Sequence, residues 1–191
     1  QALRNMLTFE SGMTGRHGAF RRLWPLRSFG LGPPLNRVTK KMNYEEFRLL
    51  YGVDESDYAH VRAFGAHAAP QIDNIIESLY AYMEEVLGNE FPIHFPDESA
   101  LARAKSLSRR AWLEFLEAKW DAEYVRSRVR IGEVHAQLQV QPRHYLAAMN
   151  KALQLLSDDK ITAGIDKKVL PTIIESLWRV GQMEGALVVD I

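Results

Sequence analysis

The sequence predicts an all-α domain of six to eight helices packed around one core. Apolar residues recur mostly at steps of three and four, the spacing that gives a helix one apolar face. Alternating runs of valine, isoleucine and threonine, which would indicate strands, are absent. Acids and prolines that start helices, and glycines that end them, divide the chain into segments of helical length. The 191 residues are enough for one domain with a full core.

The overall composition excludes several classes of function. Lysine and arginine together number 24, as do aspartate and glutamate, so the net charge of zero gives no support to a nucleic-acid or membrane-surface role. No apolar run approaches the roughly 20 residues that a membrane span needs. The absence of cysteine excludes disulfides, thiolate zinc sites, cysteine-held iron–sulfur clusters and covalent haem attachment. It also suits a reducing compartment, and we expect a cytoplasmic protein.

Residues 1–41 differ from the rest of the chain. They carry eight lysines and arginines against a single acid, Glu10, and glycines and prolines near their end would break a helix. We expect a flexible basic extension or an over-long gene start, with Met42 as the true start. The alternative is a targeting or partner-binding arm, because arginine-rich leaders with few acids can be transit peptides. The folded domain is therefore expected to span residues 42–191.

Start and stop signals then set the helices in order. Acids near the first turn and a following glycine predict the early helices, and prolines fit the first turns of later ones. A loop with Pro92 and Pro96 is expected before the N-cap Asp97, and another loop at Asp158 and Asp159. The expected helices are Asn43–Leu50, then Asp54 or Ser56 to Phe64, Pro70 to Gly88, Glu98–Leu116, a helix holding Tyr124–His135, Pro142–Leu156, and a last one starting near Asp166 or at Pro171.

One face of the helix before Pro142 combines unusual residues. Tyr124, Arg128, Ile131, Gly132 and His135 fall at helical spacing and so share that face. A glycine inside a helix costs about 1 kcal/mol relative to alanine, which is tolerable if something bulky and flat lies close to the backbone. An inward imidazole has two interpretations: a core histidine hydrogen-bonded to a neighbour, or a metal or haem ligand. Periodicity does not decide between them.

A longer motif surrounds His135. The run D-x-x-Y-x-x-x-R-x-x-I-G-x-x-H is followed by P-x-x-Y-L, and the whole stretch from Asp121 to Met149 resembles the proximal region of the globin-coupled sensor and protoglobin family. The similarity covers most of the chain after about Tyr58, and it implies a globin-like fold around a b-type haem. In the family, the residue that matches His135 is the proximal ligand of the haem iron. The matching residues here are Asp121, Tyr124, Arg128, Ile131, Gly132, His135, Pro142, Tyr145 and Leu146.

The resemblance also implies which residues surround the opposite side of the haem. Tyr80 matches a family tyrosine that donates a hydrogen bond to bound O₂, whereas Tyr82 lies on another face of the same helix. A packed core tyrosine is the alternative interpretation of Tyr80. His60, His67 and His94 are expected at surface positions, and Arg128 could equally form a surface ion pair. Residues expected to line the pocket besides His135 and Tyr80 are Leu101, Ala104, Leu107 and Ser108, together with Ile131, Gly132, Tyr124, Arg128 and Tyr145.

This family resemblance implies a haem-based O₂ sensor domain that is not itself an enzyme. O₂, or another diatomic gas such as CO or NO, would bind at the iron, and the C-terminal helices would relay the change to an output domain. The last two helices would form a homodimer. The chain ends at LVVDI in mid-helix, which suggests a sensor fragment. The alternatives are a stand-alone protoglobin with O₂, NO or peroxide chemistry, and a cofactor-free helical dimerisation module. His144 replaces a tryptophan common in the family, and Leu138–Gln139 replace isoleucine–glycine.

Overall fold

The structure is a computed structural model that describes residues 44–190, and this part of the chain is helical without strands. The all-α prediction is therefore confirmed. The predicted extension, residues 1–41, lies outside the described residues. The helices are α1 (Tyr44–Tyr51), α2 (Glu55–Ala68), α3 (Ile72–Leu87), α4 (Phe91–His94), α5 (Glu98–Glu117), α6 (Ala122–Gln137), α7 (Pro142–Leu156), α8 (Asp159–Thr162) and α9 (Leu170–Val189), with 3₁₀ turns at Ala69–Gln71 and Gly88–Glu90.

Most helix boundaries follow from local chemistry that the sequence displays. The Asp54 side chain accepts hydrogen bonds from the backbone N–H groups of Ser56 and Asp57, and this cap starts α2. Gly88 follows α3 with φ of +50°, a left-handed conformation that glycine adopts without strain. Asp97 caps α5 by accepting from the N–H of Ala100. Four of the predicted boundary signals therefore act as expected, including Pro142 in the first turn of α7.

Two predicted loops contain a short helix instead. The segment after Leu87 forms the turn Gly88–Glu90 and then α4. Pro92 fits the first turn of α4, because the N–H that proline lacks would have no partner there. The Asp158–Asp159 segment leads into α8, which Asp158 caps through the N–H of Lys160. The last helix begins at Leu170, next to Pro171 and not at Asp166.

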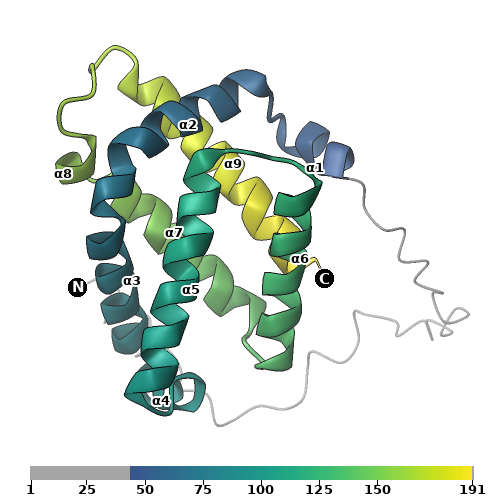
Figure 1. Ribbon diagram of the computed structural model, residues 1–191, viewed down its shortest axis with the longest axis vertical. Helices are drawn as coiled ribbons and strands as arrows, with labels where there is room; N and C mark the ends of the chain where they lie inside the picture. Colours follow the sequence, from purple (N-terminus) through teal and green to yellow (C-terminus); the bar gives the residue numbers. More distant parts are fainter. Residues whose placement is uncertain (1–43, 191) are drawn as a thin grey trace, which may run out of the picture. The chain divides into compact units, whose positions relative to one another are not determined.

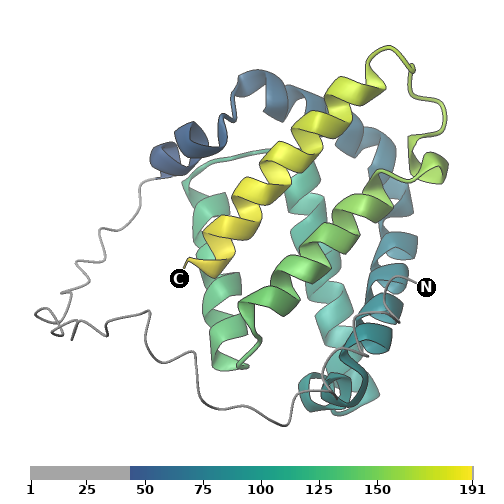
Figure 2. The same cartoon turned by 180° about the vertical axis from the view of Figure 1, so that it is seen from behind.

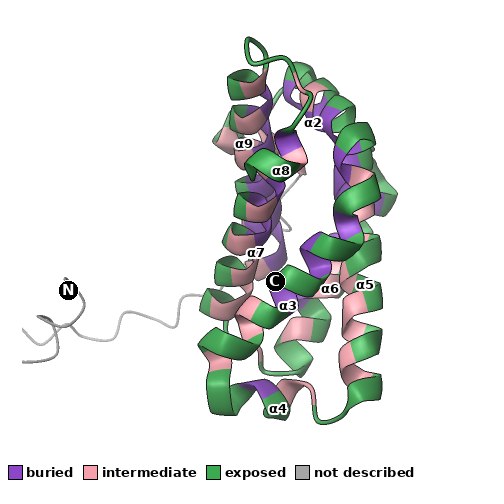
Figure 3. Ribbon diagram, turned by 90° about the vertical axis from the view of Figure 1, so that its left-hand side faces the viewer, coloured by how far each residue is buried: buried purple, intermediate pink, exposed green. Residues whose placement is uncertain are grey.

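Helix α9 lies in the interior of the fold, where it packs against four other helices. It packs against α1, α2, α6 and α7, while α3 packs between α5 and α7. Figure 2 shows α7 and α9 crossing the same face, and Figure 3 shows buried residues along the inner sides of the helices. The buried apolar residues of α9 are Ile173, Leu177, Val180, Met183, Leu187 and Val188.

Helices α5 and α6 carry many of the residues that the sequence analysis predicts for the site. They run in opposite directions and diverge toward α4, so that the end of α6 and the start of α5 lie apart (Figure 1). Near their connected ends, Arg128 of α6 donates a hydrogen bond to the carbonyl oxygen of Ala111 on α5 at 2.9 Å.

No helix in residues 44–190 is long and apolar enough to cross a membrane.

Candidate functional site

His135 lies in the last turn of α6 and is half-buried. Its Nδ1 is 2.8 Å from the backbone carbonyl oxygen of Ile131, one turn earlier. A carbonyl can only accept, so Nδ1 carries the proton, and Nε2 keeps a lone pair. Burial lowers the pKa of the His135 imidazole, and the hydrogen bond to Ile131 opposes this only in part. The ring is therefore neutral near pH 7, the form in which histidine binds a metal ion.

The Tyr145 ring from α7 forms one wall beside His135. The two ring centres are 5.0 Å apart and the planes meet at 73°, an edge-on arrangement. The pKa of the Tyr145 hydroxyl is raised, first by burial and then by the negative charge of Glu184. Tyr145 is thus a neutral aromatic side chain that limits how the imidazole can turn. Ile131 and Gly132 lie on the same helix, and Gly132 is buried.

Tyr80 occupies the inner face of α3, as its spacing predicts. It is 6% exposed, and its hydroxyl lies 2.9 Å from Ser108 Oγ on α5. Burial raises the pKa of the Tyr80 hydroxyl, so the proton stays on oxygen and can be donated. The Phe95 ring, just after α4, meets the Tyr80 ring edge-on at 5.6 Å. Tyr82 instead lies on another face, where Lys151 sits 5.0 Å from the centre of its ring.

The four residues predicted on α5 separate into two environments. Leu101 and Ala104 are half-buried against the core, and Ser108 reaches Tyr80. Leu107 is 47% exposed, so the structure does not place it with the other three. Val134 at the end of α6 is 43% exposed, which leaves apolar side chains uncovered on both of these diverging helices.

Arg128 is fully buried, so it is not part of a surface ion pair. Its Nε lies 3.2 Å from Glu184 Oε1 on α9, and its Nη1 lies 3.2 Å from Glu114 Oε2 on α5. The guanidinium also stacks over the Tyr124 ring at 4.1 Å, and the Tyr124 hydroxyl donates a hydrogen bond to Glu184. Burial raises the pKa of Glu184, and the Arg128 charge acts in the opposite direction. This buried cluster joins α5, α6 and α9 through charged groups.

Two members of the cluster escaped the sequence analysis. Glu184 and Glu114 belong to other helices than Arg128, so helical spacing alone does not connect them with it. A signal was present for Glu184, the one charged residue in the apolar run VGQMEGALVV, because an isolated acid on an apolar face needs a buried partner. The expectation of surface histidines holds for His67, whereas His60 and His94 are half-buried.

Comparison with known proteins decides the family. The sequence pattern that defines the Protoglobin family matches residues 42–191. The chain belongs to the Protoglobin family. Among solved structures, the globin domain of the Geobacter sulfurreducens globin-coupled sensor has a similar fold, with a TM-score of 0.67 at 14% sequence identity. The match covers 75% of this chain and 93% of that one. A comparison with curated proteins found no match.

Membership in this family implies that the protein binds haem and a diatomic gas. The residues present fit that group chemically. His135 offers an unprotonated Nε2, and Tyr145 restrains its ring. Gly132, about one turn before His135 on the same face of α6, has no side chain that would occupy space there. Tyr80 on α3 and Ser108 on α5 supply two hydroxyl groups that lie 2.9 Å apart. A b-type haem, held without covalent bonds, is compatible with a chain that has no cysteine.

Proposed function

We propose that residues 42–191 form a haem b-based O₂ sensor domain in which Nε2 of His135 is the protein ligand of the iron. The observation that carries this proposal is the hydrogen bond from His135 Nδ1 to the Ile131 carbonyl oxygen. It fixes the tautomer that leaves Nε2 as the donor atom, and it orients the ring before any ligand arrives. Tyr124, Arg128 and Tyr145 support the helix and ring that carry this donor.

The haem would supply an iron whose open coordination position binds a diatomic gas. Tyr80 then acts as a hydrogen-bond donor toward a polar ligand, because its raised pKa keeps the hydroxyl protonated. The Ser108 hydroxyl lies 2.9 Å from the Tyr80 hydroxyl, and either of the two can be the donor of this hydrogen bond. Leu101 and Ala104 limit the access of water, with Leu107 nearby on the same helix. This arrangement favours O₂ over CO, since the less polar CO gains less from a donor.

The sensing role depends on how α6 is connected to the C-terminal helices. His135 lies at one end of α6, and Arg128, two turns earlier, pairs with Glu184 on α9. Tyr124 adds a second link from α6 to the same carboxylate. Movement of α6 therefore changes a charged contact inside α9, where an uncompensated displacement is unfavourable. The proposal includes a homodimer through α7 and α9, an output domain beyond this chain, and a cytoplasmic location.

Hydrogen exchange, measured with and without gas, tests the sensor role. The reduced haem-loaded chain is compared under nitrogen, O₂ and CO, and exchange rates are read by mass spectrometry for peptides of α6 and α9. We expect O₂ to change exchange in both helices, and the Arg128→Met variant to keep the change in α6 but lose it in α9. Gas binding without any change in α9 would contradict the relay and favour a stand-alone protoglobin. A chain that binds no haem would favour a helical dimerisation module.

A further inference from the structure

Three side chains that are not proposed to bind the haem converge beside α4 and the start of α7. Glu90, His94 and His144 each place one potential ligand atom within 4.8 Å of the other two. His94 and His144 are half-buried, and Glu90 is exposed. We propose that these residues form a binding site for a divalent transition-metal ion of the Zn²⁺ type, with an open fourth position toward solvent. Two imidazoles and one carboxylate are a ligand set that tetrahedral zinc uses in proteins with an open position.

The backbone presents two of these ligands together. Gly88–Glu90 forms a 3₁₀ turn that continues directly into α4, so Glu90 and His94 are four residues apart on one helical face. The turn is anchored by Phe91, which is buried and whose ring centre lies 4.7 Å from that of Phe95. Phe95 in turn packs against Tyr80. The two ligands therefore project from a segment held by aromatic packing, which reduces the ordering that a metal ion would have to impose.

The third ligand comes from the first turn of α7. This ligand is His144, whose Nδ1 is buried, lacks a hydrogen-bond partner and lies 4.0 Å from Glu90 Oε2. Two ligand atoms that each bind zinc at about 2.0–2.2 Å in tetrahedral geometry are roughly 3.3–3.6 Å apart, so a small inward movement is sufficient. A metal ion would satisfy the His144 nitrogen, and it would join α4 to α7 across about fifty residues of sequence. None of the residues proposed to bind the haem takes part.

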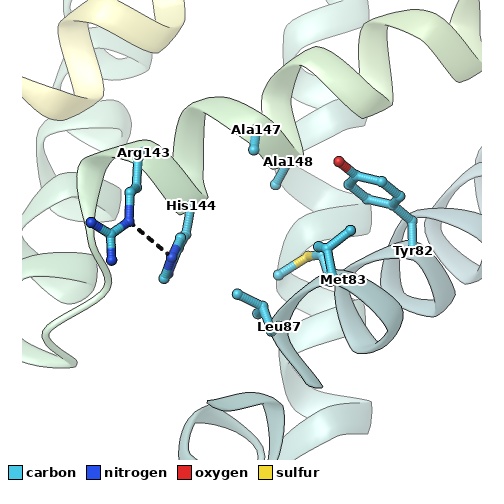
Figure 4. Close-up of a pocket in the computed structure, with 8 residues that line it drawn as sticks. Tyr82, Met83, Leu87, Arg143, His144, Ala147 and Ala148 are labelled. Carbon is cyan, nitrogen blue, oxygen red and sulfur yellow. Dashed lines mark hydrogen bonds between the residues drawn. The ribbon is translucent and has the colours of Figure 1, made fainter. Parts of the chain in front are cut away.

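One neighbour opposes this binding and provides a test. Arg143 Nε donates to His144 Nε2 at 3.2 Å, as Figure 4 shows. This bond favours the tautomer with the proton on Nδ1, whereas a metal ion at Nδ1 requires the proton on Nε2. The positive guanidinium also repels a cation. Arg143 is exposed and its hydrogen bond is weak in water, so it reduces the affinity without abolishing the site.

Titration calorimetry with Zn²⁺ alone tests the proposal on the full, haem-loaded chain after chelator treatment. We expect one zinc ion per chain and a higher thermal midpoint with zinc. Substitution of any one ligand, in His94→Ala, His144→Ala or Glu90→Gln, should weaken binding at least about tenfold. Arg143→Ala should strengthen it several-fold. His67→Ala is the matched control, because His67 is an exposed histidine on α2, and it should bind zinc as the wild type does.

The haem site is kept separate by one further variant. Zinc binding that persists in His135→Ala would place the ion away from the proposed haem ligand, whether or not that chain takes up haem. Glu90→Gln changes an exposed side chain and should fold normally, which circular dichroism can verify. Zinc binding that is absent, or equally strong in Glu90→Gln, His144→Ala and wild type, would overturn the proposal.

Discussion

Replacing Arg128 by methionine should destabilise the protein severely, because it leaves Glu184 buried without its positive partner. The Nε–Oε1 distance is 3.2 Å, and at an effective dielectric constant of about 20 this pair attracts by about 5 kcal/mol. Removal of one member of a buried pair typically costs 3–5 kcal/mol. At about 2–4 °C per kcal/mol for a protein of this size, we expect the thermal midpoint to fall by roughly 6–20 °C.

A neighbouring arginine gives a control on Glu114, the other acid that Arg128 contacts. Arg110 pairs with Glu114 at 3.8 Å, but its side chain is 72% exposed, so Arg110→Met should cost less than about 1 kcal/mol. The variant Glu184→Gln keeps an acceptor for Tyr124 and removes the buried negative charge. The double variant Arg128→Met/Glu184→Gln should therefore recover most of the stability that Arg128→Met loses.

The stability of Arg128→Met should also depend on pH in a definite direction. The pKa of Glu184 is already raised by burial in the wild type, and loss of Arg128 raises it further. A folded-state pKa above the unfolded value means that the folded chain binds more protons in this interval, so stability falls as the pH rises through it. Denaturant unfolding of Arg128→Met should thus show its largest deficit at neutral pH and a smaller one near pH 5. A deficit below about 1 kcal/mol at pH 7, or strict additivity in the double variant, would refute this reasoning.

Three further substitutions test the pocket and the helix packing. Tyr80→Phe removes the hydroxyl donor, so O₂ should dissociate faster from the reduced haem-loaded protein while CO changes less; flash photolysis measures both, and equal effects would argue against a hydrogen bond to the ligand. Gly65→Ala would bring a Cβ within 2.3 Å of the Leu116 carbonyl oxygen and should cost at least about 2 kcal/mol in denaturant unfolding, because backbone cannot move away easily. Gly181→Ala meets only the flexible methyl groups of Leu153 at 2.8 Å and gains helix propensity, so it should cost less; the opposite order would contradict this account of the packing.

Local signals explain how far the sequence could predict the fold. Asp54, Asp97 and Pro142 act within one helical turn of themselves, so their effects can be identified without knowledge of the tertiary structure. Four-residue helices such as α4 are too short to show a periodic apolar face, and Pro92 in that segment looked like a loop residue. Their existence depends on packing, here of Phe91, that no local rule contains.

The candidate site shows the same division. Tyr80 and His135 were predicted from spacing and family resemblance, and the structure adds the hydrogen bonds to Ser108 and to the Ile131 carbonyl. The fate of Arg128 could not be predicted, because its partners Glu114 and Glu184 lie 14 residues before and 56 residues after it. Only the crossing of α5, α6 and α9 brings these charges together. Pairings of this kind depend on tertiary geometry and have no fixed offset in a sequence.

The absorption spectrum of the purified chain with haemin tests the central claim most directly. It should be recorded oxidised, reduced, and reduced under O₂ or CO, for wild type, His135→Ala and the control His67→Ala. The account predicts a Soret band that shifts on reduction and again with gas in wild type and control. In His135→Ala this band should be lost or should resemble that of free haemin. The same spectra in His135→Ala and wild type would show that another residue binds the iron, and would contradict the assignment of His135.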